Sequence, residues 1–495
     1  MFFNKPSLFL WLFFLPICST AQEEILKLGL SEIIVLAQSD APDVLIAQTR
    51  FSNRYWSYQS FLADFKPQIS LTSDNAPFLR RAINPITLPD GSIAFINQSL
   101  MQNGLNLRLQ QQIPATGGTI FTNTGLERID IFNSGAPNDV SYQSTPLSIN
   151  YIQPIFQYNR QKWQRIIQPL SFEIAEKSYS EDLEQIAFDA TNLFFDVLNA
   201  QLSVEAAGKD KADADTLYNI SKGRFEVGRI AETDLLQIEL SARNAEQSLA
   251  TATLALQTAT NELRDFLGIQ QAVRFELLPP YEIPDIQINA VEALTYARQH
   301  RSAIINFQRR LREAESGVAE AKGITGPSAD LFVSLGLSQT GKTLGDAYNS
   351  PLDQERMSVS FQIPIADWGK ARATLETAKS NQALTKMLVD QDRTNFEREI
   401  LLKVQQFDLV RNQVALAKRT YEVAQKTNSI TRQRYLVGKI GITELNIALN
   451  QQESSRQAYV RALQSFWIAY YNLRLLTLYD FIRDKALVRS SEVEE

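Results

Sequence analysis

Two periodicities of apolar and polar residues divide the chain into two kinds of segment. Short stretches alternate every second residue, with Leu, Val, Ile or Met on one face and mostly Ser, Asn, Gln or Gly on the other. This alternation predicts β-strands that separate two different environments. The environments are either lipid and water or the dry and wet sides of an ordinary sandwich, and the pattern alone leaves both open. The stretches are 68–72, 105–110, 147–151, 331–338 and 357–362.

Longer segments repeat apolar residues at alternating steps of three and four, which predicts helices with coiled-coil packing. The two series are Leu183, Ile186, Ala190, Leu193, Val197, Ala200, Val204 and Ala207, and Phe396, Ile400, Val404, Phe407, Val410, Val414, Ala417, Tyr421 and Ala424. A helix over about 158–222 would be roughly 100 Å long, and Pro169 is expected to bend or interrupt its first turns.

Other helices are expected on both sides of these segments. The pattern predicts returning helices over 232–267 and 442–478, and a helical region over 25–65 that breaks near Ala41-Pro42.

One short phrase occurs twice, at a displacement of 210 residues. Residues 224–235 and 434–445 share the pattern R-[FY]-x-V-G-[RK]-I-x-x-T-[DE]-L. A Gly that adopts positive φ, followed by a Thr-acid pair suited to capping, is typical of one helix ending and another beginning. Each copy therefore predicts the tip of a helical hairpin.

The repetition extends beyond the tips, so the chain is an internal duplication. Residues 154–160 match 364–370 at the same displacement, whereas Glu32, Ala37 and Pro67 match residues 260 positions later. The first copy therefore has 50 additional residues between Pro67 and Pro154. The predicted organisation is a signal peptide (1–21), a first repeat (22–278), a Pro-rich linker (279–288), a second repeat (289–480) and a polar C-terminal tail (481–495).

The first residues resemble a secretory signal. Lys5 precedes an apolar run, 8–17, that is too short to span a bilayer, and Ser19-Thr20-Ala21 is a small-residue cleavage site. Cleavage at Cys18 as a lipoprotein is the alternative, which the bulky Ile17 disfavours. The mature chain would have no cysteine and 48 basic against 55 acidic residues, a balance that opposes a nucleic-acid partner.

No apolar run after residue 21 resembles a transmembrane helix, so entry into a membrane would require a closed β-barrel. Each repeat supplies two principal strands, which gives about four per chain, or six if the 50-residue insertion joins the sheet. Single-chain membrane barrels begin at about eight strands. The expected fold is therefore mainly α, with duplicated helical hairpins and strands that contribute to a barrel shared by several chains.

Taken together, the duplication, the Pro-Ile phrases before long helices and the two Val-Gly tips resemble the TolC family of outer-membrane efflux and secretion proteins. The resemblance covers essentially the whole mature chain. It implies a homotrimer with a 12-stranded outer-membrane barrel and a periplasmic α-helical barrel. It also implies a passive exit duct that a periplasmic adaptor links to an inner-membrane pump, for efflux or type I secretion.

The resemblance further implies site residues. Acidic residues just past the tips would close the duct, and Asp234 and Glu444 hold such positions, although capping or beginning a helix is an alternative role for both. Ile440 stands where some members have a latching Arg, and Ile447 replaces a second acidic residue, so the gate is expected to differ here. The adaptor-facing positions would be Val227, Gly228, Arg229, Ile230, Val437, Gly438, Lys439 and Ile440.

Candidate chemistry is sparse. Residues 336–343 match G-x-x-x-x-G-K-[ST], but the alternating strand before them and the turn residues after them favour a surface loop over a phosphate site. His300 is the only histidine, lies in a polar run and is expected to be solvated. No catalytic group, metal site or cofactor is expected. The aromatic group Phe466, Trp467, Tyr470 and Tyr471 favours helix packing over a membrane-interface belt.

Three functional hypotheses remain, of which an exported hydrolase on a helical frame has no visible constellation of acid, base and nucleophile. The first is the outer-membrane exit duct. The alternative is a periplasmic coiled-coil scaffold or adaptor without a membrane barrel, which would leave the two-faced strands without a role.

Overall fold

The computed structural model describes residues 24–132, 138–271, 273–436, 439–440 and 442–488. The chain forms two compact units, and each draws on both repeats. The first comprises residues up to 45, 185–285 and 409–471, and the second comprises 46–184, 286–408 and 472 onward. Within the described ranges, no helix combines the length and the apolar character that a membrane crossing requires.

The helices repeat at the displacements seen in the sequence, which confirms the internal duplication. α1 and α5 begin 260 residues apart, as do α2 and α6, whereas α3 and α8, and α4 and α9, begin 210 apart. The bounds are α1 Leu30–Asp40, α2 Pro42–Ala63, α3 Arg160–Glu226, α4 Glu232–Phe266, α5 Ala290–His300, α6 Ser302–Thr325, α7 Leu344–Tyr348, α8 Lys370–Leu436 and α9 Ile442–Thr477.

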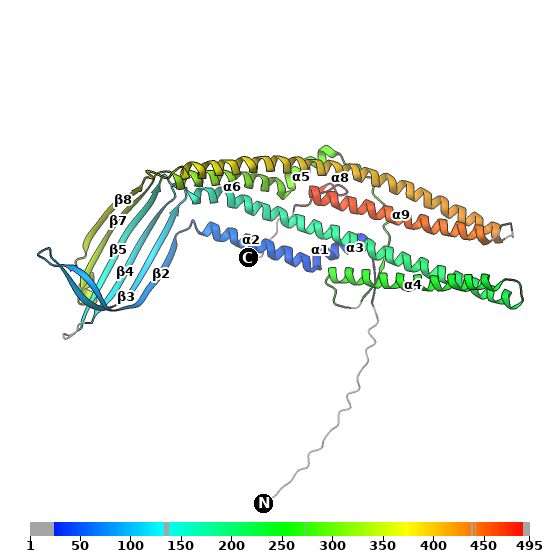
Figure 1. Cartoon of the computed structure of the whole chain (residues 1–495), viewed down its shortest axis with the longest axis horizontal. Helices are drawn as coiled ribbons and strands as arrows, with labels where there is room; N and C mark the ends of the chain where they lie inside the picture. Colours follow the sequence, from blue (N-terminus) through cyan, green and yellow to red (C-terminus); the bar gives the residue numbers. More distant parts are fainter. Residues whose placement is uncertain (1–23, 133–137, 272, 437–438, 441, 489–495) are drawn as a thin grey trace, which may run out of the picture. The chain divides into compact units, whose positions relative to one another are not determined.

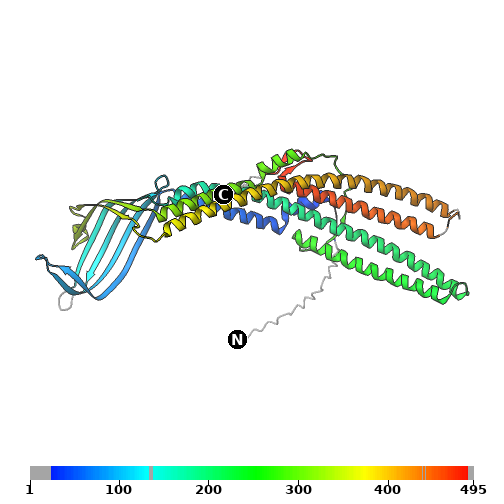
Figure 2. The same cartoon turned by 45° about the horizontal axis from the view of Figure 1, so that its top comes forward.

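The two long helices agree with the predicted hairpins. α3 and α8 each contain 67 residues, and each is followed by a returning helix, α4 or α9 (Figure 2). Pro169 lies inside α3 without interrupting it, although it lacks the N–H that would bond to the preceding turn. The break between α1 and α2 falls at Ala41, whose extended ψ of 141° suits the residue before a proline.

Small strands at three places differ from the sequence analysis. Residues 25–28, predicted as the start of a helix, belong to β1 (Glu24–Leu28), which pairs in parallel with β6 (Val273–Leu277). Phe275 and Leu277 are buried there, and Lys27 bonds to Glu276 at 3.0 Å. β9 (Tyr479–Asp480) pairs with β10 (Lys485–Ala486), so a short hairpin occupies part of the segment predicted as a polar tail.

The main sheet has six strands in the order β2-β3-β4-β5-β7-β8, all antiparallel to their neighbours (Figure 1). Of the two predicted counts, four and six, the larger one is correct. The 50-residue insertion pairs into the sheet because it forms two strands that bond to neighbours on both sides. The bounds are β2 Gln68–Thr87, β3 Ile93–Ile113, β4 Gly118–Ile131, β5 Asp139–Ile155, β7 Ser328–Gly341 and β8 Leu352–Gln362.

The predicted coiled-coil seams are buried or half-buried. On α8, seven of the nine seam residues are buried, including Ile400 and Phe407 at 0% exposure. In the first unit, the aromatic group of α9 packs in the core: Phe466, Tyr470 and Tyr471 are buried, and Trp467 contacts all three rings. These side chains therefore serve helix packing.

Candidate functional site

The first hairpin tip, Val227–Ala231, closes with a glycine in the left-handed region. Gly228 has φ +71°, its N–H donates to Phe225, and the N–H of Arg229 donates to Arg224, both at 2.8 Å. This pair of bonds is a Schellman motif, which satisfies the last carbonyls of α3. Val227 is 69% exposed and Arg229 is also exposed, so the tip presents an apolar side chain and a cation to solvent.

The second tip repeats part of this geometry. The N–H of Lys439 donates to Arg434 at 2.9 Å, which corresponds to the Arg229–Arg224 bond 210 residues earlier. Lys439 is exposed and Ile440 is half-buried. The two other predicted docking residues of this tip, Val437 and Gly438, lie outside the described residues.

The two predicted gate carboxylates are exposed and occupy the first turn of the helix after each tip. Asp234 belongs to α4 and Glu444 to α9, and neither has an ion-pair partner within the described part of the chain. Asp234 does not cap α4, because Ala231 is the N-cap and no side chain bonds there, but it begins this helix, as the alternative to the gate role expected. An acidic side chain in the first turn still favours the positive end of the helix dipole.

Polar bonds that sequence reasoning missed connect the two hairpins within the first unit. Asn199 of α3 donates to Gln464 of α9 at 3.0 Å, and Arg456 of α9 donates to Glu205 of α3 at 2.9 Å. The Pro-rich linker joins the same region, because the Tyr459 hydroxyl donates to the carbonyl oxygen of Tyr281 and their rings stack. These partners are far apart in the chain, so no local pattern marks them.

The six-stranded sheet exposes large apolar side chains on one face. The strand registers place Ile69 of β2 opposite Leu109 of β3, and Ile149 of β5 opposite Leu335 of β7. All of these side chains are exposed, as is Phe361 of β8 at 74%. The face comprises Ile69, Leu71, Leu105, Leu107, Leu109, Leu147, Ile149, Leu335, Leu337, Met357, Val359 and Phe361.

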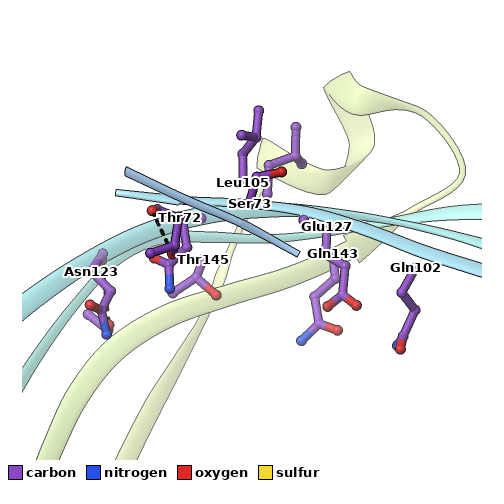
Figure 3. A pocket seen from close by; sticks show the side chains of 13 residues that line it. Thr72, Ser73, Gln102, Leu105, Asn123, Glu127, Gln143 and Thr145 are labelled. Atoms are coloured by element: carbon purple, nitrogen blue, oxygen red, sulfur yellow. Dashed lines mark hydrogen bonds between the residues drawn. The ribbon is translucent and has the colours of Figure 1, made fainter. Parts of the chain in front are cut away.

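The opposite face of the sheet is polar and hollowed. A cavity of about 740 Å³ is lined mainly by polar side chains of β2, β3, β4 and β5. Figure 3 shows Gln102, Glu127 and Gln143 pointing to one side of the strands and Leu105 to the other. On this polar face Arg108 also lies 3.9 Å above the ring of Phe121. The structure therefore presents two chemically different surfaces on one sheet.

The phosphate-loop match, residues 336–343, is mostly strand. Residues up to Gly341 belong to β7, which pairs with β5 on one side and β8 on the other, so this was not the surface loop expected. Thr343 caps the five-residue helix α7 and forms a capping box with Asp346. Backbone groups engaged in a sheet are not arranged to hold phosphate.

His300 is half-buried rather than solvated. It lies against the Tyr296 ring, and its partial burial, followed by the charge of Lys177, lowers its pKa. No group of three or more His, Cys, Asp or Glu side chains within the described ranges could hold a metal ion.

Residues 112–269 and 293–477, well over half of the chain, match the family described as "Outer membrane efflux protein". Outer membrane protein TolC of Escherichia coli (strain K12) is 24% identical over 258 residues, which are 49% of this chain and 51% of that protein. The chain thus spans about half the length of this relative.

Two solved structures share the fold. The Campylobacter jejuni CmeC outer membrane channel gives a TM-score of 0.63 at 14% identity and covers 90% of this chain and 85% of that chain. The open state of the Neisseria gonorrhoeae MtrE outer membrane channel gives 0.60 at 14% identity, with 90% and 88% covered. The expected resemblance and outer-membrane location are confirmed, and this chain belongs to the outer membrane efflux protein family.

Proposed function

We propose that the chain is a passive exit duct through the outer membrane, assembled as a homotrimer and serving a tripartite efflux pump or a type I secretion system. The observation that carries this proposal is the six-stranded sheet, which has one exposed apolar face and one polar face. A barrel wall between lipid and water needs this combination. A lone sheet in water would leave its apolar face and both edge strands uncovered.

Several copies are needed because one sheet of six strands is smaller than the eight-stranded barrels at which single chains begin to close. The edge strands β2 and β8 each have one side that no strand within the described residues pairs with. Lipid contains no water to satisfy such an edge, so neighbouring copies must pair with it.

The hairpin tips suit a docking role toward a periplasmic adaptor that leads to the inner-membrane pump. At the first tip the exposed Val227 and Arg229 flank the hydrogen-bonded turn at Gly228. A fixed turn with an exposed apolar side chain offers a small hydrophobic anchor at little entropic cost to a partner. The proposed docking set also includes Ile230, Lys439, Ile440 and the undescribed Val437 and Gly438.

Fractionation and bilayer recording test the duct. The chain should remain with outer membranes, and purified oligomers should form channels in planar bilayers. Recovery of the chain in the soluble periplasmic extract, without channels, would favour the alternative of a coiled-coil scaffold.

Glu444 tests the gate. Its carboxylate is exposed in the first turn of α9, where it can bind a cation or a basic side chain of a neighbouring copy, and such charge pairs would hold the tips together. Glu444→Ala should therefore raise single-channel conductance several-fold if the carboxylates help to hold the tips shut. Glu399→Ala, an exposed carboxylate on α8 far from the tip, is the control. Equal conductance in both variants would remove Glu444 from the gate.

A further inference from the structure

The inserted hairpin β3–β4 lies in the interior of the sheet. β3 pairs with β2 along one side and with β4 along the other, and β4 pairs in turn with β5. The registers cover the length of the hairpin, from Leu100 opposite Ile131 to Ile113 opposite Gly118. The insertion is therefore part of the sheet and not a loop above it.

The inserted strands also continue both faces of the sheet. Leu107 and Leu109 of β3 lie opposite Leu71 and Ile69 of β2, and Leu105 lies opposite Leu126 of β4. On the polar face, the hollow drawn in Figure 3 receives Gln102 from β3 and Glu127 from β4. A strand that completes an apolar band on one side and a polar lining on the other has the pattern of a membrane wall.

We propose, on the basis of the proposed duct, that this hairpin widens the membrane pore. Three copies of a six-stranded sheet supply 18 strands, whereas the resemblance implied 12. Barrel diameter grows roughly linearly with strand number, so the pore would be about 1.5-fold wider between backbones. The exit would then accept cargo of larger cross-section than a 12-stranded exit of the same type.

The strand directions allow such a barrel to close. Six strands that alternate in direction leave β2 and β8 antiparallel to one another, so β8 of one copy can pair antiparallel with β2 of the next. Closure would satisfy every strand edge, as a membrane requires.

The internal duplication predicts the register of this contact. Within the chain, Ile152 of β5 lies opposite Phe332 of β7. Ile152 corresponds to Gln362 of β8 at the 210-residue displacement, and Phe332 corresponds to Thr72 of β2 at the 260-residue displacement. If the contact between copies repeats the contact within the chain, Gln362 of one copy lies opposite Thr72 of the next.

Cysteine pairs test both the register and the number of copies. Cys18 is the only cysteine, so a Cys18→Ser background is free of thiols. In this background, Thr72→Cys with Gln362→Cys should form disulfides between copies, and the covalent ladder on a denaturing gel should end at trimers. The control is Asn106→Cys with Gln362→Cys. Asn106 lies one strand further than Thr72, about 9.6 Å from Gln362, which is beyond the reach of a disulfide.

Pore width is measured separately with a single thiol on the polar face. Ser148→Cys on β5 lines the hollow and is labelled from outside intact cells with maleimide-polyethylene glycols of graded size. The full chain should admit polymers of about 1.5-fold larger diameter than a variant lacking residues 93–131, which removes β3 and β4. If that variant does not assemble, the disulfide ladder of the full chain tests the proposal, because it reports the register and the number of copies.

A ladder that ends at dimers would overturn the proposal, because two copies would then close a 12-stranded barrel. Outer-membrane trimers without the Thr72–Gln362 disulfide, or an unchanged size limit after removal of the hairpin, would also contradict it while leaving the duct intact. Absence of the chain from the outer membrane would refute both the wider pore and the proposed duct.

Discussion

Gly228 and Gly223, near the end of α3, differ in one backbone property. A Cβ at either position would meet nothing within 4 Å, but only Gly228 has a positive φ, +71°. Space is therefore not what requires glycine at the tip. The requirement comes from the left-handed turn that satisfies the last carbonyls of the helix.

This difference predicts opposite effects of one substitution. Gly228→Ala should destabilise the tip by about 1 kcal/mol, because alanine is strained at positive φ. Gly223→Ala should stabilise the helix by roughly 0.5–1 kcal/mol, because alanine loses less conformational entropy there. Amide hydrogen exchange near residues 224–231 measures both changes. Equal protection in the two variants would show that the turn does not depend on its glycine.

A second residue-scale prediction concerns Asp189 of α3. Burial raises the pKa of this half-buried carboxyl, a hydrogen bond from Gln185 lowers it, and the charge of Asp43 raises it further. Since the folded chain then binds the proton more tightly than the unfolded chain, stability contributed by this group falls as pH rises through the folded pKa.

Asp189→Asn should therefore raise stability at pH 7 by up to about 0.5 kcal/mol, a small value because solvent screens the charge. The gain should vanish below the ordinary carboxyl pKa of 3.8, where the native side chain is protonated in both states. Thermal dissociation of the oligomer at pH 7 and at lower pH measures it. Asp213→Asn, on the exposed side of α3, is the control, and a gain that persisted at low pH would disprove the electrostatic cause.

At the scale of elements, α3 is held to the end of α9 within the second unit by a buried ion network. Arg474 donates two bonds of 3.0 Å to Glu184 and one of 3.2 Å to Asp480. The carboxylate side chains of Glu184 and Asp480 are each 4% exposed. A buried ion pair adds little net stability, but loss of one partner leaves uncompensated charge.

Arg474→Met should therefore cost about 3–5 kcal/mol, and the double variant Arg474→Met with Glu184→Met should recover part of the loss. Arg243→Met, which removes two exposed ion pairs on α4, should change stability by less than about 0.5 kcal/mol. Limited proteolysis and thermal unfolding compare the three. A single Arg474 variant as stable as the control would show that the network is not structural.

At the scale of the whole molecule, function depends on which solvent each face of the sheet meets. Neighbouring residues on β3 test this, because Leu107 belongs to the apolar face and Asn106 to the polar one. An arginine on the lipid side of a membrane strand costs roughly 2–4 kcal/mol near the bilayer midplane.

Leu107→Arg should therefore reduce the yield of assembled outer-membrane oligomer strongly, since every copy bears the cost. Asn106→Arg, one residue away, should assemble normally. Heat-resistant oligomer on a gel of outer membranes measures both. Comparable assembly of the two variants would show that the apolar face does not meet lipid.

The sequence alone determined what local patterns encode. The long helices, the returning helices and the tip turn at Gly228 follow from periodicity and from glycine chemistry, and the duplication follows from displacement. Only part of the site could be predicted in this way. The positions of Asp234 and Glu444 in a first turn were expected, but their gate role and the docking role of the tip residues remain predictions.

Tertiary structure decided what depends on contacts between distant residues. β1 is a strand because β6, about 250 residues later, pairs with it, and Glu205 bonds to Arg456 across a similar separation. The alternation of 105–110 was visible in the sequence, but membership of the sheet required partners on β2 and β4. The number of strands in a sheet depends on which strands pair and not on any one strand. The six-stranded width of the main sheet was therefore decided only by the tertiary structure.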